Sequence, residues 1–142
     1  MQKHYDGLER MHSKSTTNKT LNSKIKISQG EAELNINTNA VMHNAIKEIH
    51  NAYYFMALET ASFYAANSLI EDVLVFTKSF EIIFSKQTTS DKLIAKGKFN
   101  EKSMGNYIIT AELYDNKNNL IAKGKGIFRR SKNLFENIKN YQ

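Results

Sequence analysis

Glu59 is the only charged residue in the most apolar stretch of the chain, the fifteen residues from Ala52 to Ala66. The stretch contains no Gly or Pro and is rich in Ala and aromatic residues. It is too long for an ordinary strand, so it predicts a helix from about Asn51 to Ile70. Because apolar residues lie on nearly every side of that helix, we expect the rest of the chain to fold around it.

The chemistry of Glu59 makes it a candidate site residue. A buried carboxylate without a partner is costly, so a chain with no use for it would normally carry an apolar residue there. Burial also raises the pKa of a carboxyl group, which is how proteins prepare general acids and bases. The same pattern also fits a Glu59 that is partly exposed or that bonds a tyrosine. The polar residues Asn44, His50 and Asn51 stand just before the helix and complete the candidate set.

Length and composition set the broad class. The 142 residues are enough for one domain with its own core, and the absence of Cys excludes disulfides and thiolate chemistry. The first residues lack the apolar run of a secretory signal, and the helix around Glu59 is too short and too polar for a membrane span. We therefore expect a cytoplasmic protein. His43, His50 and Glu59 do not form a close His-x-x-x-His pattern, so no metal is expected.

The net charge of +6 is concentrated at the two ends. Residues 1–26 and 121–142 are basic, whereas the residues between them are mildly acidic. Basic ends are compatible with nucleic acid, an acidic membrane, a phosphorylated small ligand or a plain solvated surface. The chain has no recognised nucleic-acid motif and no Gly-rich phosphate loop, so no nucleic-acid partner is expected.

The remaining segments predict a sheet. Residues 1–23 are polar, and we expect them to be partly helical near Tyr5 to Met11 or mobile. Residues 25–37 have strand character interrupted at Gly30. Four later runs are strand-like: Val73 to Ser85, Lys92 to Asn100, Asn106 to Tyr114 and Leu120 to Arg129.

The last of these runs alternates a small or apolar face with a mostly basic one, so a helix can lie close to its small side. The short connections between the four runs predict a meander of antiparallel neighbours. The sum is an α+β domain over residues 24–130, in which one curved antiparallel sheet wraps around one long central helix. Residues 131–142 form a tail that could be helical through Leu134, Phe135 and Ile138.

This order of elements resembles the hotdog fold, and specifically the acyl-CoA thioesterases of the phenylacetic-acid-degradation (PaaI-like) type. The resemblance covers roughly residues 24–130 and rests on one spaced pattern. Such proteins carry Asn-Ala-Ile-Gly-x-x-His-Gly-Gly before the helix, an acidic residue nine positions after the His, and a Ser or Thr on the next strand. Here the pattern begins at Asn44 and continues through His50, Glu59 and Thr77. The chain departs from it at Lys47 and at Asn51-Ala52, which replace glycines.

The resemblance implies a catalytic role for Asn44, His50, Asn51, Glu59 and Thr77. The role attributed to the glycines at the helix start belongs to their backbone N–H groups and not to a side chain. The Asn51 amide can therefore still donate a hydrogen bond to a thioester oxygen. Glu59 would activate water or attack the thioester directly, with Thr77 orienting the water. We expect His50 to shape the turn more than to transfer protons. The residues expected to contact substrate are Tyr53, Tyr54, Phe55 and Phe63 for the acyl chain, and Arg129, Arg130 and Lys132 for the CoA phosphates.

Helix geometry adds a prediction that is independent of family. Asn51 and Glu59 are separated by about 12 Å at 1.5 Å per residue, so one chain cannot present both to the same carbonyl carbon. If both act, the Asn51 end of one copy must face Glu59 of a second copy, which predicts a homodimer that can associate further into a dimer of dimers. No cofactor is expected besides the acyl-CoA ligand.

Two functions fit the sequence. The spacing of Glu59 and Thr77 favours a thioesterase. The side chains that replace glycines at 47, 51 and 52 narrow the approach to the helix, and they favour a non-catalytic, regulatory protein that binds acyl-CoA or an acyl carrier.

Overall fold

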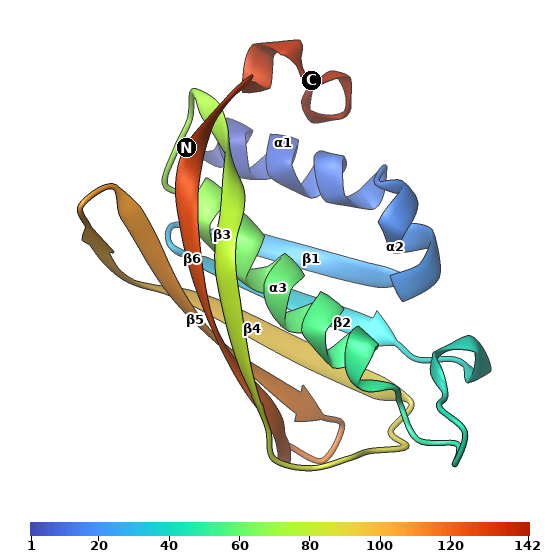
Figure 1. Cartoon of the computed structure of the whole chain (residues 1–142). Coiled ribbons are helices and arrows are strands. Elements are labelled where there is room, and N and C mark those ends of the chain that lie inside the picture. Colours follow the sequence, from blue (N-terminus) through green and yellow to red (C-terminus); the bar gives the residue numbers. More distant parts are fainter.

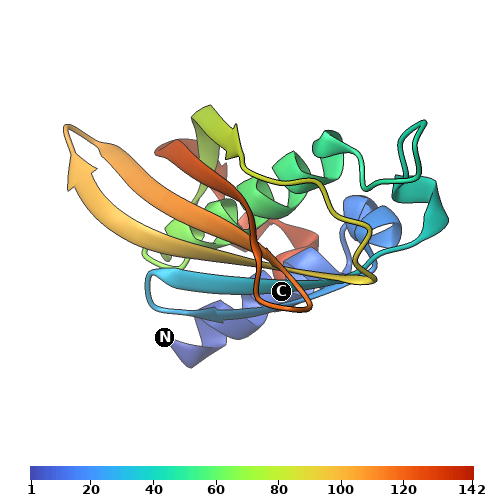
Figure 2. The same ribbon diagram turned by 90° about the horizontal axis from the view of Figure 1, so that it is seen from below.

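The computed structural model describes all 142 residues and contains one six-stranded antiparallel sheet (Figure 1). The strand order is β1-β2-β4-β5-β6-β3. The strands are β1 (Ser23–Ser28), β2 (Glu31–Asn37), β3 (Val73–Phe84), β4 (Lys92–Ser103), β5 (Asn106–Asp115) and β6 (Leu120–Leu134). The sheet curves around helix α3 (Asn51–Asn67), which confirms the expected α+β architecture (Figure 2).

Helix α3 packs directly on the sheet because small residues line the sheet face beneath it. A side chain at Gly97 of β4 would meet the carbonyl oxygen of Ala61 at 2.7 Å. A side chain at Gly124 of β6 would meet the ring of Phe80 at the same distance, close to Leu58. Glycine is therefore required at Gly97, where the contact is with the backbone of α3, whereas a side chain at Gly124 would displace the Phe80 ring. The alternation of small residues and lysines in β6 places the small ones inward, as predicted.

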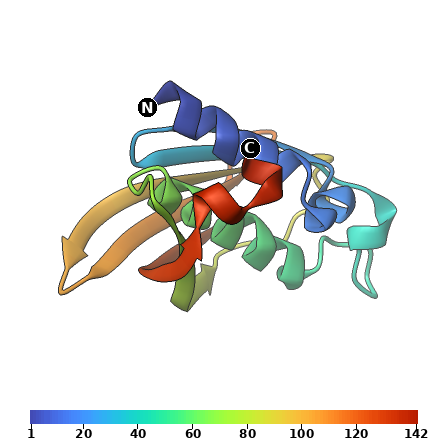
Figure 3. The same ribbon diagram turned by 90° about the horizontal axis from the view of Figure 1, so that it is seen from above.

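The N-terminal arm consists of α1 (Gln2–Ser13) and α2 (Thr16–Leu21), and it packs beside β1 and α3. The buried ring of His4 bonds the Tyr141 hydroxyl at 2.7 Å and the Asn67 carbonyl oxygen at 2.8 Å. The chain end, with 3-10 turns η2 (Phe135–Asn137) and η3 (Lys139–Tyr141), lies against α1 (Figure 3). Both termini are thus parts of the packed domain.

Two features of the strand pattern differ from the sequence prediction. Residues 25–37 form two strands, because Gly30 adopts φ +72° and turns the chain back into a hairpin. The predicted meander of four strands is wrong at its first connection: β3 pairs with β6 and not with β4. Residues 85–91 instead cross from one edge of the sheet to its middle (Figure 2). Contacts with the body of the domain hold this connection, including the bond from the Ile49 N–H to the Thr88 carbonyl at 3.0 Å.

Strand β3 is an edge of the sheet and has no neighbour on its outer side. It spans 12 residues and exposes three large apolar side chains, Phe76, Ile83 and Phe84. A long apolar edge strand is a template for pairing with another chain.

None of the helices combines the length and the apolar character that crossing a bilayer requires.

Candidate functional site

The loop before α3 is built by two polar side chains that the sequence pattern contains. Asn44 Oδ1 accepts from the N–H groups of Ile46 and Glu48, each at 3.0 Å, and so closes the loop on itself. His50 is the N-cap of α3, and its Nδ1 accepts from the Ala52 N–H at 2.9 Å. This bond occupies one ring nitrogen in capping the helix, in line with the turn-shaping role expected for His50.

Lys47 stands where the resembling proteins carry a glycine, and it adopts φ +65°. This is the left-handed region that glycine enters at little cost and that other residues enter only under strain. The turn therefore keeps the conformation that glycine favours even though the side chain differs.

The first amide of α3, that of Asn51, has no hydrogen-bond acceptor within the chain. It lies at the positive end of the helix dipole, where an N–H group favours a negatively charged oxygen. Gln87 Nε2 donates to the Asn51 side-chain oxygen at 2.9 Å and so fixes the side chain beside this amide. Sequence reasoning missed Gln87, because it reaches α3 only through the unexpected crossing of residues 85–91.

Glu59 and Thr77, two members of the spaced pattern, are in contact. Thr77 Oγ1 donates to Glu59 Oε2 at 2.6 Å, joining β3 to the middle of α3. Burial raises the pKa of the Glu59 carboxyl above its ordinary value, and the bond from Thr77 opposes part of that rise. Glu59 is half-buried and remains open on one side. The arrangement is that of a carboxylate prepared to take up a proton.

The predicted aromatic residues occupy different environments. Phe55 is 44% exposed on the outer face of α3, in edge contact with Phe80. Tyr53 and Phe63 are half-buried on the same helix. Tyr54 corrects the prediction of a substrate contact: it is 0% exposed, and its hydroxyl accepts from the Thr88 N–H at 3.0 Å, so it is a core residue that anchors the crossing connection.

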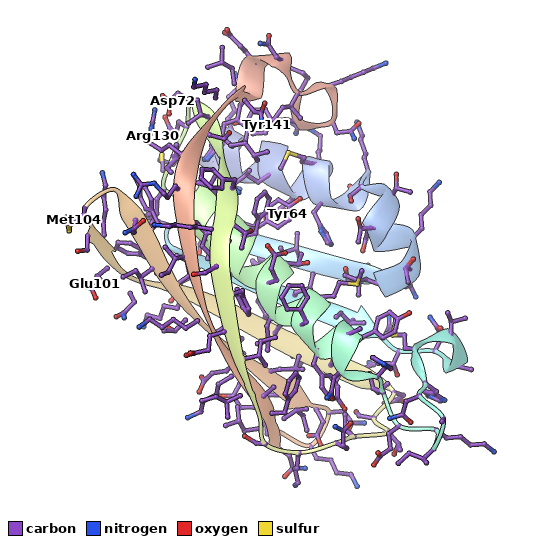
Figure 4. All side chains as sticks on the ribbon, in the orientation of Figure 1. Tyr64, Asp72, Glu101, Met104, Arg130 and Tyr141 are labelled. Atoms are coloured by element: carbon purple, nitrogen blue, oxygen red, sulfur yellow. The ribbon has the colours of Figure 1, made fainter.

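The two arginines of β6 bond to other parts of the chain. Arg129 donates to Asn106 Oδ1 at 2.8 Å, at the turn between β4 and β5. Arg130 pairs with the Asp72 carboxylate, which lowers the pKa of that carboxyl (Figure 4). Lys132 is exposed near the end of the strand. Their role toward phosphate stays a prediction.

Glu59 also borders a cavity of about 180 Å³ between α3 and the N-terminal arm. Two buried residues of this cavity, His12 and Tyr64, were not among the predicted site residues. No sequence signal marked them, because the polar arm gave no sign that it would pack against α3.

The comparisons with known proteins concern the fold. Neither a known family model nor any curated protein matches the amino-acid sequence. Among solved structures, the E. coli PaaI protein from the phenylacetic acid degradation operon is similar at a TM-score of 0.85 and 19% identity, over 94% of this chain and 96% of that chain.

Two further structures show the same likeness. A thioesterase family protein from Silicibacter pomeroyi has a TM-score of 0.77 and 18% identity, over 88% of this chain and 99% of that one. A thioesterase from Haemophilus influenzae has a TM-score of 0.78 and 13% identity, over 87% of each chain. The chain therefore has the hotdog fold, the six-stranded sheet wrapped around one long helix that these structures share.

Proposed function

We propose that the protein binds an acyl-CoA thioester in a site formed by two copies of the chain and hydrolyses it to a free acid and CoA. The observation that carries this proposal is the hydrogen bond between Thr77 and Glu59, because it holds a carboxylate of raised pKa open on one side. The names of the similar structures support the same class of reaction.

The proposed reaction uses Glu59 and Thr77 of one copy and the Asn51 N–H of the other. The ionised Glu59 takes a proton from a water molecule that Thr77 helps to orient, and the water oxygen attacks the thioester carbonyl carbon. The carbonyl oxygen gains negative charge and accepts a hydrogen bond from the Asn51 N–H of the other copy. The C–S bond then breaks, and the proton passes from Glu59 to the departing sulfur. Direct attack by the Glu59 carboxylate on the carbonyl carbon would use the same geometry.

The dimer has a defined register in this proposal. A two-fold axis that brings Asn51 opposite Glu59 of the other copy requires antiparallel helices. The residue midway between them, Phe55, then faces its own copy across the axis. Phe55 is the large apolar residue that α3 exposes, which supports this register. The apolar, unpaired edge of β3 supports an interface on the same side of the molecule.

The acyl chain would lie along Tyr53, Phe55 and Phe63, which are accessible on α3. Arg129, Arg130 and Lys132 would contact the CoA phosphates. Phosphate binding would then exchange the present partners of the two arginines, Asn106 and Asp72, for phosphate oxygens.

A second candidate function is non-catalytic binding of acyl-CoA or an acyl carrier. The observation that favours it is the Asn51 side chain, which stands at the helix start where the resembling thioesterases carry glycine, and which Gln87 holds in place. A fixed side chain there would leave room for a ligand but would hinder attack on the thioester.

A thiol-release assay with short, long and aromatic acyl-CoAs, run beside calorimetric binding, separates the two. Thiol release by the wild type and its loss in Glu59→Gln, with binding kept, would establish hydrolysis. Binding without thiol release would support the second candidate. If Glu59→Gln releases thiol at the wild-type rate, Glu59 has no part in the chemistry.

A further inference from the structure

A series of hydrogen bonds runs from the crossing connection, residues 85–91, to the first residue of α3. The Thr88 N–H donates to the Tyr54 hydroxyl oxygen at 3.0 Å. The Tyr54 hydroxyl donates to Gln87 Oε1 at 3.4 Å, and Gln87 Nε2 donates to Asn51 Oδ1 at 2.9 Å. The series therefore ends at the side-chain carboxamide of Asn51.

The direction of this series follows from its first member, which can only donate. Because a backbone N–H cannot accept, the bond from Thr88 makes the Tyr54 oxygen an acceptor and leaves the Tyr54 proton to be donated. Burial raises the pKa of Tyr54, so the hydroxyl keeps that proton near pH 7. The acceptor of this proton is the oxygen of the Gln87 carboxamide, which turns the Gln87 nitrogen toward Asn51. The atom of Asn51 that faces Gln87 is therefore its oxygen.

The carboxamide nitrogen of Asn51, Nδ2, is left free to donate elsewhere. Asn51 is exposed, so this nitrogen can be reached by a ligand. Neither Nδ2 nor the backbone N–H of Asn51 has an acceptor within the chain. One residue thus presents two donors at the positive end of the α3 dipole.

We propose that the Asn51 carboxamide donates a second hydrogen bond to the thioester oxygen, beside the bond from the Asn51 N–H, and that Gln87 positions it. This inference rests on the proposed function, because it assumes that the thioester carbonyl lies at the start of α3. Donors that stabilise such an oxygen are most effective when they are fixed before the reaction, so that nothing has to rearrange as charge develops. The bond from Gln87 fixes the Asn51 carboxamide in this way.

This proposal and the second candidate function assign opposite effects to the Asn51 side chain. Asn51→Ala and Asn51→Gly remove the carboxamide and keep the backbone N–H, so kcat falls if the side chain donates and rises if it hinders attack. Asn51→Asp keeps the size of the side chain but replaces Nδ2 by an oxygen, so a purely steric role would leave kcat unchanged. An acidic residue in the first turn stabilises a helix, so a lower kcat without a lower Tm would not come from a weakened helix.

The first experiment measures thiol release. We expect Asn51→Ala and Asn51→Gly to lower kcat by about 100-fold, the effect of one donor to such an oxygen, with little change in KM. Gln87→Ala should lower kcat by about tenfold, because the carboxamide then turns freely. In the Asn51→Ala background Gln87→Ala should cause no further loss, since Gln87 acts through Asn51. Gln142→Ala is the matched control, because the Gln142 side chain bonds only carbonyl groups of η2.

The second experiment tests the donor without turnover. Hexanoyl-, palmitoyl- and benzoyl-CoA, labelled with carbon-13 at the thioester carbonyl, are offered to Glu59→Gln with and without Asn51→Ala. Infrared difference spectra of the most tightly bound ligand give the stretching frequency of the labelled carbonyl. A hydrogen bond donated to the oxygen weakens the C=O bond, so we expect the frequency to rise when the Asn51 carboxamide is removed.

The two experiments separate a failure of this inference from a failure of the proposed function. If Asn51→Gly releases thiol at the wild-type rate or faster while Glu59→Gln is inactive, the donor role is overturned and hydrolysis stands. If wild type releases no thiol, hydrolysis fails, and the infrared spectra decide: a higher frequency with Asn51→Ala supports the donor, and an unchanged one overturns it. If none of the three acyl-CoAs binds, both are overturned. A further tenfold loss from Gln87→Ala in the Asn51→Ala background would show that Gln87 does not act by positioning Asn51.

Discussion

Thr77 Oγ1 donates a 2.6 Å hydrogen bond to Glu59 Oε2, and this bond joins the free edge strand β3 to the middle of α3. The two residues are 18 positions apart in the chain, and the turn between helix and strand brings them together. The bond has two effects on Glu59: it orients one carboxylate oxygen, and it favours the ionised form of a group whose burial favours the neutral form.

Replacing Thr77 by Val should therefore raise the pKa of Glu59 further, because the donor to the ionised form is lost. If Glu59 acts as a general base, activity appears as the pH rises through its pKa, and the acidic limb of the pH profile of kcat should move to higher pH. Thr77→Ser keeps the hydroxyl and serves as the control, with a limb near that of wild type. If the acidic limbs of the pH profiles of kcat coincide for wild type and Thr77→Val, the bond from Thr77 does not shift the pKa of Glu59.

Glu59→Gln should stabilise the protein near neutral pH while lowering thiol release by at least about 100-fold. Because the folded-state pKa of Glu59 is raised, the folded state holds the proton more tightly than the unfolded state. Stability is then lost as the pH rises through the interval between the two pKa values. Gln cannot ionise, so we expect the variant to have the higher Tm at pH 7 to 8 and an equal Tm below about pH 4.

Thermal unfolding across this pH range checks the prediction for Glu59. Glu101→Gln, at an exposed carboxylate near the β4–β5 turn, is the control and should show no such pH-dependent gain (Figure 4). A Glu59→Gln variant that is less stable than wild type at pH 8 would contradict the argument.

Much of the fold could be predicted because its elements are periodic. The apolar stretch around Glu59 and the alternation within the later strands predicted α3 and four of the six strands. The order of the strands could not be predicted, because a seven-residue connection fits a hairpin as well as the crossing that residues 85–91 make. The alternation of residues within β3 does not indicate which other strand it will pair with.

Some residues of the candidate site could likewise be predicted from the sequence, and others could not. Glu59 stands out as the one charge in an apolar stretch, Asn44 and Thr77 were identified through the resemblance to a spaced family pattern, and the structure brings Glu59 and Thr77 into contact. Gln87 and His12 reach α3 through long-range packing, and nothing in their neighbouring residues announces it. The arm is polar by composition, yet the bonds of His4 span 63 and 137 positions and tie the arm to the end of α3 and to the C-terminus.

Lys47→Gly should stabilise the protein by about 1 kcal/mol. Lys47 is held at φ +65°, where a side chain costs on the order of 1–2 kcal/mol, and the greater freedom of glycine in the unfolded chain offsets part of the gain. Denaturant unfolding would measure the difference, with Lys47→Ala as a control that keeps the Cβ and should show no gain. If the alanine variant gains as much as the glycine variant, the lysine charge and not the backbone is the cause.

Phe55→Cys should give a disulfide-linked dimer, because the proposed register places residue 55 opposite its own copy. The natural chain has no Cys, so the variant carries a single thiol and any cross-link must join two copies at this position. Mild oxidation followed by non-reducing electrophoresis gives the yield. Met104→Cys, at a residue 92% exposed at the β4–β5 turn, controls for chance collisions and should stay mostly monomeric on the gel (Figure 4). Equal yields from the two variants would contradict the register, and with it the pairing of Asn51 with Glu59 of the other copy. A high yield from Phe55→Cys alone would support a dimer in which residue 55 of α3 lies beside its own copy, as the proposed register requires.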